Sequence, residues 1–96
     1  MASVSFHPEA RDEYDGALAW YEARSRRAAT RFEAEVDRVV ALIASQPEAF
    51  PAYDTDHRFA VLRRFPYSIV YRTQTDRVTV VALAHSARRA GYWSGR

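Results

Sequence analysis

The spacing of apolar residues changes once along this chain, and that change limits the folds it can adopt. Before residue 46, two stretches carry apolar residues at the same helical offsets of 0, 4, 7, 8 and 11. These residues are Ala10, Tyr14, Ala17, Leu18 and Tyr21 in the first stretch and Phe32, Val36, Val39, Val40 and Ile43 in the second. After residue 57 the apolar residues alternate with a period of two, as in strands. The pattern therefore predicts a pair of helices followed by a sheet.

The two helical stretches are predicted to form an antiparallel hairpin. Residues 24–27 interrupt the apolar pattern, so a connector of about four residues is expected between the helices. Pro8 stands where the start of a helix tolerates proline, and Pro47 ends the second stretch. Trp20 lies beside the first apolar stripe and is expected to pack against the core.

Four segments are predicted to be strands. Residues 4–6 precede the first helix as an edge strand, and residues 58–64, 67–73 and 77–84 follow the loop of residues 46–57. Short connections between the last three favour antiparallel pairing. The last strand is apolar on both faces, which indicates a central or doubly covered position. The predicted fold is α+β, in the order β-α-α-β-β-β, with the helical hairpin packed on one face of a small, mainly antiparallel sheet.

Length and composition set further limits. The 96 residues leave room for a single domain, residues 1–96, and 48% hydrophobic with 27% charged residues is typical of a globular protein. There is no cysteine, and His7, His57 and His85 lack the spacing of a zinc site, so no metal or cofactor is expected. No signal peptide or bilayer-spanning run is recognisable, so we expect a cytoplasmic protein without a membrane partner.

Charge is distributed unevenly along the chain. Residues 1–57 contain six arginines against eleven acidic residues, a formal charge of −5, whereas residues 58–96 contain eight arginines against one, a formal charge of +7. There is no lysine. Because the planar guanidinium group suits phosphate and carboxylate, the basic half indicates an anionic partner, either nucleic acid or an acidic protein.

Residues 85–93 form the candidate site. His85, Arg88 and Tyr92 follow the most apolar strand within eight residues. An imidazole that titrates near neutrality and a fixed cation suit chemistry on a phosphodiester. Alternatively, His85 is a hydrogen-bonded residue at a strand end, and Tyr92 and Trp93 close the core. The residues considered for nucleic-acid or target binding are Arg58, Arg63, Arg64, Arg72, Arg89, Trp93 and Arg96.

A succession of short motifs resembles the RelE/ParE superfamily of type II toxins over essentially the full length. They are Phe6-His7-Pro8-Glu9-Ala10, Trp20-Tyr21-Glu22, Arg31-Phe32, Pro47-Glu48-Ala49-Phe50-Pro51 and the segments 63–71 and 85–93. The resemblance implies a bacterial, plasmid-stabilisation-type toxin that inhibits growth and is neutralised by a cognate antitoxin in a hetero-oligomer. Antitoxins of this superfamily typically wrap the toxin with a segment that folds on binding, and an acidic segment would complement the +7 half.

The resemblance leaves two targets open. RelE-like members are endoribonucleases that cut messenger RNA, usually on the ribosome, whereas ParE-like members act on DNA gyrase and lack the catalytic set. Tyr92 matches the C-terminal tyrosine of the ribonucleases, Arg88 matches one of their basic residues, and His85 stands where some members have a basic or imidazole group. Ser68 and Ser86, however, replace two of their cations. A degenerate, non-toxic interaction partner is the third possibility.

In the ribonuclease hypothesis, the RNA 2′-hydroxyl attacks the neighbouring phosphate. His85 would then handle a proton, Arg88 would stabilise charge on the phosphate, and Tyr92 would orient the substrate or protonate the leaving oxygen.

Overall fold

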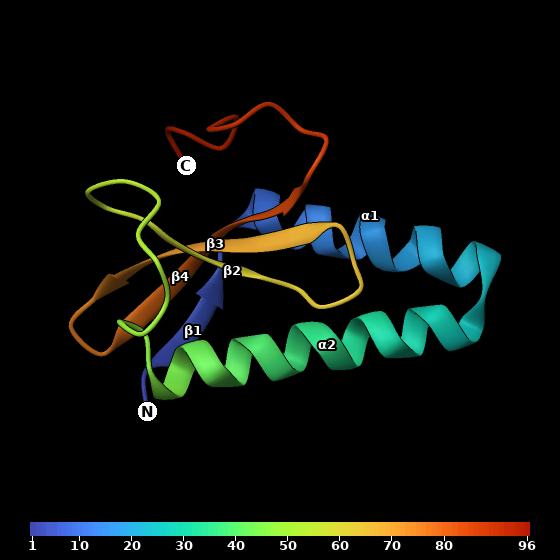
Figure 1. Ribbon diagram of the computed structural model, residues 1–96, viewed down its shortest axis with the longest axis horizontal. Coiled ribbons are helices and arrows are strands. Elements are labelled where there is room, and N and C mark those ends of the chain that lie inside the picture. The colour runs from blue at the N-terminus through green and yellow to red at the C-terminus, as the bar shows by residue number, and fades with distance from the viewer.

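The structure, a computed structural model, describes residues 1–96 and has two layers. The two helices run side by side along one face of a four-stranded sheet (Figure 1). The elements in chain order are β1 (Ser3–Phe6), α1 (Pro8–Arg24), α2 (Arg26–Ser45), β2 (Arg58–Val61), β3 (Tyr67–Gln74) and β4 (Arg77–His85). The α+β class and the order β-α-α-β-β-β predicted from the sequence are confirmed.

The sheet has the strand order β1-β4-β3-β2. Strand β4 pairs with β3 in antiparallel and with β1 in parallel, and β2 pairs with β3 in antiparallel. The central place of β4 matches its apolar sequence on both faces, and β1 lies at an edge as predicted.

A bulge in β4 lets this strand contribute to two cores. Tyr71 lies opposite Val80 and Val70 lies opposite Ala82, so Val81 has no partner in the register. An extra residue of this kind changes which face the following side chains point to. Val80 belongs to the core under the helices, whereas Val81 and Ala82 both belong to a smaller cluster on the opposite face.

The main core lies between the helical hairpin and the sheet, and Phe32 is at its centre. Phe32 is fully buried, and its ring centre lies 5.0–5.8 Å from the rings of Tyr14, Tyr21, Phe65 and Tyr67. These contacts join both helices to β3 and to the loop before it, and they confirm the helical stripes inferred from the sequence.

The smaller core is closed by the C-terminal segment. Trp93 is buried against Val70, Val81 and Ala82, on the face of the sheet opposite the helices. Figure 1 shows this segment, in red, on the side of the strands away from α2. Trp93 therefore fits the core-closing interpretation.

The connector between the helices is shorter than the expected four residues and consists of Ser25 alone. Ser25 is extended, with φ of −163°; its hydroxyl accepts from the N–H of Ala28 at 3.1 Å, and its own N–H donates to the carbonyl of Tyr21. One residue thus caps the end of α1 and the start of α2, so the apolar pattern breaks without a longer loop.

Two other expectations were wrong. Trp20 does not pack into the core but is 52% exposed, with the guanidinium of Arg24 over its ring at 3.8 Å, because it lies outside the buried stripe of α1. Strand β2 ends at Val61 rather than at residue 64, since Arg64 has a left-handed φ of 67° that strand geometry does not allow.

No helix of the structure combines the length and the apolar character needed to cross a bilayer.

Candidate functional site

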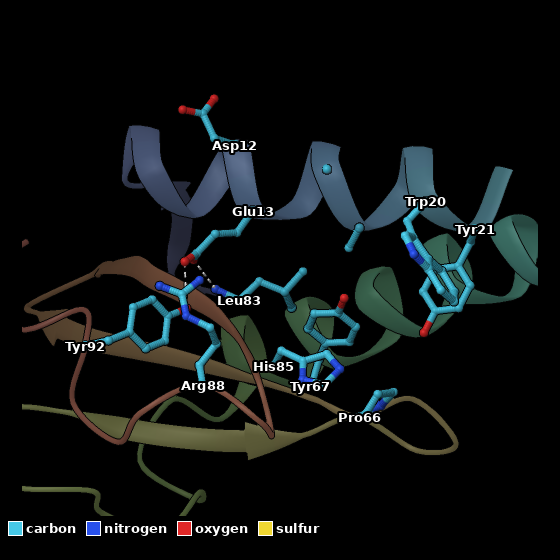
Figure 2. A pocket seen from close by; sticks show the side chains of 12 residues that line it. Asp12, Glu13, Trp20, Tyr21, Pro66, Tyr67, Leu83, His85, Arg88 and Tyr92 are labelled. Carbon is cyan, nitrogen blue, oxygen red and sulfur yellow. Dashed lines mark hydrogen bonds between the residues drawn. The ribbon is translucent and has the colours of Figure 1, made fainter. Parts of the chain in front are cut away.

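The fold places the three candidate catalytic residues around one pocket. This pocket, about 440 Å³ in volume, lies between α1 and the end of β4, and we call it the α1 pocket. His85, Arg88 and Tyr92 all line it (Figure 2), and all three also line a second pocket of about 330 Å³ under the C-terminal segment. The sequence therefore identified residues that do meet in space.

Helix α1 forms the opposite wall of the α1 pocket. Trp20 and Tyr21 stand at one end of this wall, and Glu13 reaches toward Tyr92 and Arg88 at the other (Figure 2). Gly16 lies between them and leaves the middle of the wall without a side chain. The pocket is thus aromatic at one end and charged at the other.

Glu13 is the central residue of the charged end, and sequence reasoning missed it. Its Oε2 accepts from the Tyr92 hydroxyl at 2.6 Å. Its Oε1 accepts from the main-chain N–H of Leu83 at 3.1 Å and from Nη1 of Arg96 at 2.9 Å. One carboxylate therefore joins α1 to β4 and to the C-terminal segment, across 70 to 83 residues of sequence.

Tyr92 is held in its protonated form. Burial, and next the hydrogen bond to Glu13, raise the pKa of the Tyr92 hydroxyl above its usual range. The guanidinium of Arg88 lies over the Tyr92 ring at 3.9 Å from the ring centre. The phenol of Tyr92 thus donates its proton to a hydrogen bond with Glu13, and its ring packs against the guanidinium of Arg88.

His85 caps the turn that follows β4. Its Nδ1 accepts from the main-chain N–H of Ala87 at 3.0 Å, and its ring meets the Tyr67 ring edge-on with centres 5.0 Å apart. Because Nδ1 is the acceptor, a neutral His85 carries its proton on Nε2. This geometry fits the alternative of a hydrogen-bonded residue at the end of a strand.

Arg96 is bound inside the protein rather than presented to a target. Besides Glu13, its Nη1 contacts the carbonyl of Val81 at 3.0 Å, which is the carbonyl of the bulge residue, and its Nε lies 3.7 Å from Glu9. The Arg96 side chain is only 11% exposed. These contacts of Arg96 therefore attach the C-terminal segment to the rest of the fold.

Three other binding candidates are also engaged or buried. Arg72 donates to the main-chain carbonyl of Arg96 at 2.8 Å, Arg58 donates to the carbonyl of Phe50 at 2.7 Å, and Trp93 is buried. Arg89 is exposed beside Arg88 in the second pocket. The remaining two, Arg63 and Arg64, line neither pocket. The basic half thus does not form one continuous surface.

No group of three or more histidine, cysteine, aspartate or glutamate residues is arranged to hold a metal ion. The polar groups that line the α1 pocket include the imidazole of His85, the guanidinium of Arg88, the phenol of Tyr92 and the carboxylates of Asp12 and Glu13.

Comparison with known proteins identifies the family. Residues 4–90 match the family described as ParE toxin of type II toxin-antitoxin system, parDE. The structure is similar to a chain of the "Chromosomal ParDE TA system from P. aeruginosa", with a TM-score of 0.71 and 18% sequence identity over 88% of this chain and 96% of that chain. No curated protein sequence gives a significant match. Since the family match spans most of its length, the chain belongs to the ParE toxin family of type II toxin–antitoxin systems.

Proposed function

We propose that this toxin arrests growth by binding DNA gyrase, and that it makes and breaks no bonds itself. The chain belongs to the ParE toxin family. According to the resemblance noted from the sequence, ParE-like members act on gyrase. In this proposal the cognate antitoxin neutralises the toxin through an acidic segment that folds on binding. The observation that carries the proposal is the hydrogen bond between Tyr92 and Glu13.

A ribonuclease would need the Tyr92 hydroxyl for its substrate. Here that hydroxyl donates to Glu13 at 2.6 Å, and its pKa is raised by burial and by the same bond. A hydroxyl with a raised pKa is a poor proton donor, and a substrate oxygen would have to displace a charge-assisted bond to reach it. The arrangement therefore supports a structural role for Tyr92.

Two of the cations that a ribonuclease would need are replaced by serine in the second pocket, which Arg88 and Arg89 also line. Ser68 and Ser86 line this pocket at the two positions where RelE-like ribonucleases have cations. Arg72, one candidate to replace them, donates to the carbonyl of Arg96. Because the loss of one fixed charge-stabilising donor typically slows an enzyme about 10²–10³-fold, the loss of two favours a toxin that acts by binding.

The α1 pocket supplies a surface that suits a protein target. Trp20 is a large aromatic residue, 52% exposed, and Arg88 stands at the opposite end of the same pocket. Tryptophan and arginine are the residues that most often dominate protein–protein binding energy. We infer that gyrase binding depends on both.

A supercoiling assay with purified gyrase tests the proposal. The wild-type toxin is expected to inhibit supercoiling, and Trp20→Ala is expected to weaken inhibition by about tenfold or more, as for the central residue of an interface. Leu42→Ala is the matched control, because Leu42 is 42% exposed on α2 and lines neither pocket. Tyr92→Phe is expected to keep inhibition.

Other outcomes would overturn the proposal. Undisturbed supercoiling together with specific breaks in translated messages, removed by Tyr92→Phe or Arg88→Ala, would identify a ribonuclease. Growth that is unaffected by expression without the antitoxin would identify a non-toxic interaction partner.

A further inference from the structure

Four arginine side chains without a partner surround a separate groove. Arg27 and Arg31 extend from α2, and Arg63 and Arg64 lie on the loop between β2 and β3. They line a hollow of about 670 Å³ that shares no residue with the α1 pocket. All four are exposed, and none of their guanidinium groups makes a hydrogen bond or ion pair within the protein. We call this hollow the arginine groove.

The arginine groove combines three features that cost stability. The first turn of α2 contains Arg26 and Arg27 and no acidic residue, although the helix dipole favours anions there. Arg27 and Arg31 are like charges one helical turn apart. Arg64 has a left-handed φ of 67°, a conformation that glycine or asparagine adopts more readily. Local rules are broken in this way mostly at functional sites.

The one acidic residue in the groove is already neutralised. Both oxygens of Glu35 accept from Arg38 at 2.8 Å, and Oε2 also accepts from the main-chain N–H of Arg63 at 2.6 Å. The hydrogen bonds from Arg38 lower the pKa of the Glu35 carboxyl. Glu35 therefore fixes the β2–β3 loop against α2, and the four arginines stay available for an external anion.

We propose that the arginine groove binds the phosphate backbone of duplex DNA. Guanidinium groups match phosphate oxygens in pairs of hydrogen bonds, and contacts to the backbone need no apolar anchor. An acidic protein segment is a poorer fit, since protein interfaces depend on large apolar or aromatic anchors. The apolar residues that line the groove are Ala28, Ala34 and Phe65, and the Phe65 ring is packed against Tyr21 and Phe32. The proposal is independent of the gyrase target.

A single strand fits the groove less well than a duplex. Proteins hold single strands largely by stacking bases on free aromatic rings. Phe65 is the only aromatic residue in the groove, and its ring packs on Tyr21 and Phe32 with centres 5.3 Å apart in each case. No ring is left to receive a base, so the groove favours the outside of a duplex.

Fluorescence anisotropy with a labelled DNA duplex, measured over a series of salt concentrations, tests the proposal. Arg27→Gln/Arg31→Gln is expected to reduce the slope of log K against log salt by about 1.8, because each lost phosphate contact contributes about 0.9. The matched control is Arg11→Gln/Arg77→Gln, which removes the same charge from exposed positions outside the groove. We expect the control to leave the slope within about 0.3 of wild type.

Arg64→Asn separates binding from folding. Asparagine tolerates the left-handed φ of residue 64, so the thermal midpoint should stay the same or rise. The salt slope should nevertheless fall by about 0.9.

Three results would overturn the proposal. One is an equal loss of slope in the control, which would indicate general charge attraction. Another is a wild-type slope that Arg64→Asn leaves unchanged. The third is binding of a polyglutamate peptide that depends on Arg27 and Arg31 in the absence of DNA binding, which would assign the groove to an acidic protein.

Discussion

The two arginine-rich regions of this toxin differ in what their guanidinium groups contact. At the C-terminal segment, Arg96 is 11% exposed and contacts Glu13, Glu9 and a main-chain carbonyl. In the arginine groove, Arg27 and Arg31 have no partner. The same residue type therefore attaches a segment to the fold in one region and leaves its charge available in the other.

This difference shows why a formal charge of +7 over residues 58–96 is a poor guide to a binding surface. A paired, mostly buried arginine stabilises the fold, and little of its field reaches a partner. An unpaired arginine on the surface adds nothing to stability and attracts anions. Substitutions in the two regions should therefore differ in the sign and the size of their effect on stability.

Trp93→Ala is expected to have the largest effect. Trp93 closes the second core and is 3% exposed, so its truncation should lower the free energy of unfolding by about 3–5 kcal/mol. Urea denaturation measures this loss. A loss below about 1 kcal/mol would mean that the C-terminal segment does not stabilise the sheet.

Glu13→Ala should follow, with a loss of about 2–3 kcal/mol, because it leaves the Tyr92 hydroxyl, the Leu83 N–H and Arg96 without their acceptor. The pKa of Tyr92 should also fall toward its usual value, which a high-pH absorbance titration measures. Glu9→Ala is the control, since Glu9 is 63% exposed and lies 3.7 Å from Arg96. Equal losses in both variants would contradict the central role of Glu13.

The sequence predicts most of the fold because the spacing of apolar residues follows the buried face of each helix and strand. Two helical stripes and alternating strands were sufficient for the element order and for the central place of β4. Periodicity does not predict the one-residue connector at Ser25, since a residue that caps two helices interrupts the stripe as a longer loop would. The parallel partner of β1 is likewise set by tertiary packing.

The candidate site was predictable only where its residues are neighbours in sequence. His85, Arg88 and Tyr92 lie within eight residues and do line one pocket. Glu13 is 79 residues from Tyr92, and no local pattern distinguishes it from other acids near the start of a helix. The arginine groove is not predictable from the sequence, because it combines residues from the acidic half of the chain with residues from the basic half.

Glu35→Gln tests the one neutralised acid of the arginine groove. Hydrogen bonds to Arg38 and to the Arg63 N–H hold the folded-state pKa of Glu35 below its usual 4.5. The stability that Glu35 contributes is therefore complete well above pH 4.5 and is lost as the pH falls through the lowered pKa. The variant should be about 1–2 kcal/mol less stable than wild type at neutral pH.

Urea denaturation at several pH values measures this difference, which should shrink steadily in acid. Glu33→Gln is the control on the same helix, because Glu33 is exposed and has no hydrogen-bond partner there. A difference that persists unchanged in acid would show that the amide disturbs packing, and that the charge of Glu35 is not the cause.

The smallest expected effect has the opposite sign. Arg27→Gln/Arg31→Gln removes a like-charge pair one turn apart near the positive end of α2, so the free energy of unfolding should rise by about 0.3–0.5 kcal/mol. This gain should disappear in about 1 M salt, where the Debye length is about 3 Å.

Arg96→Gln, in contrast, should destabilise the protein in both low and high salt, because its contacts are largely buried. Thermal melts of the two variants in low and high salt therefore compare the regions directly. If Arg27→Gln/Arg31→Gln destabilised the protein as Arg96→Gln does, the groove arginines would be structural, and the contrast between the two regions would fail.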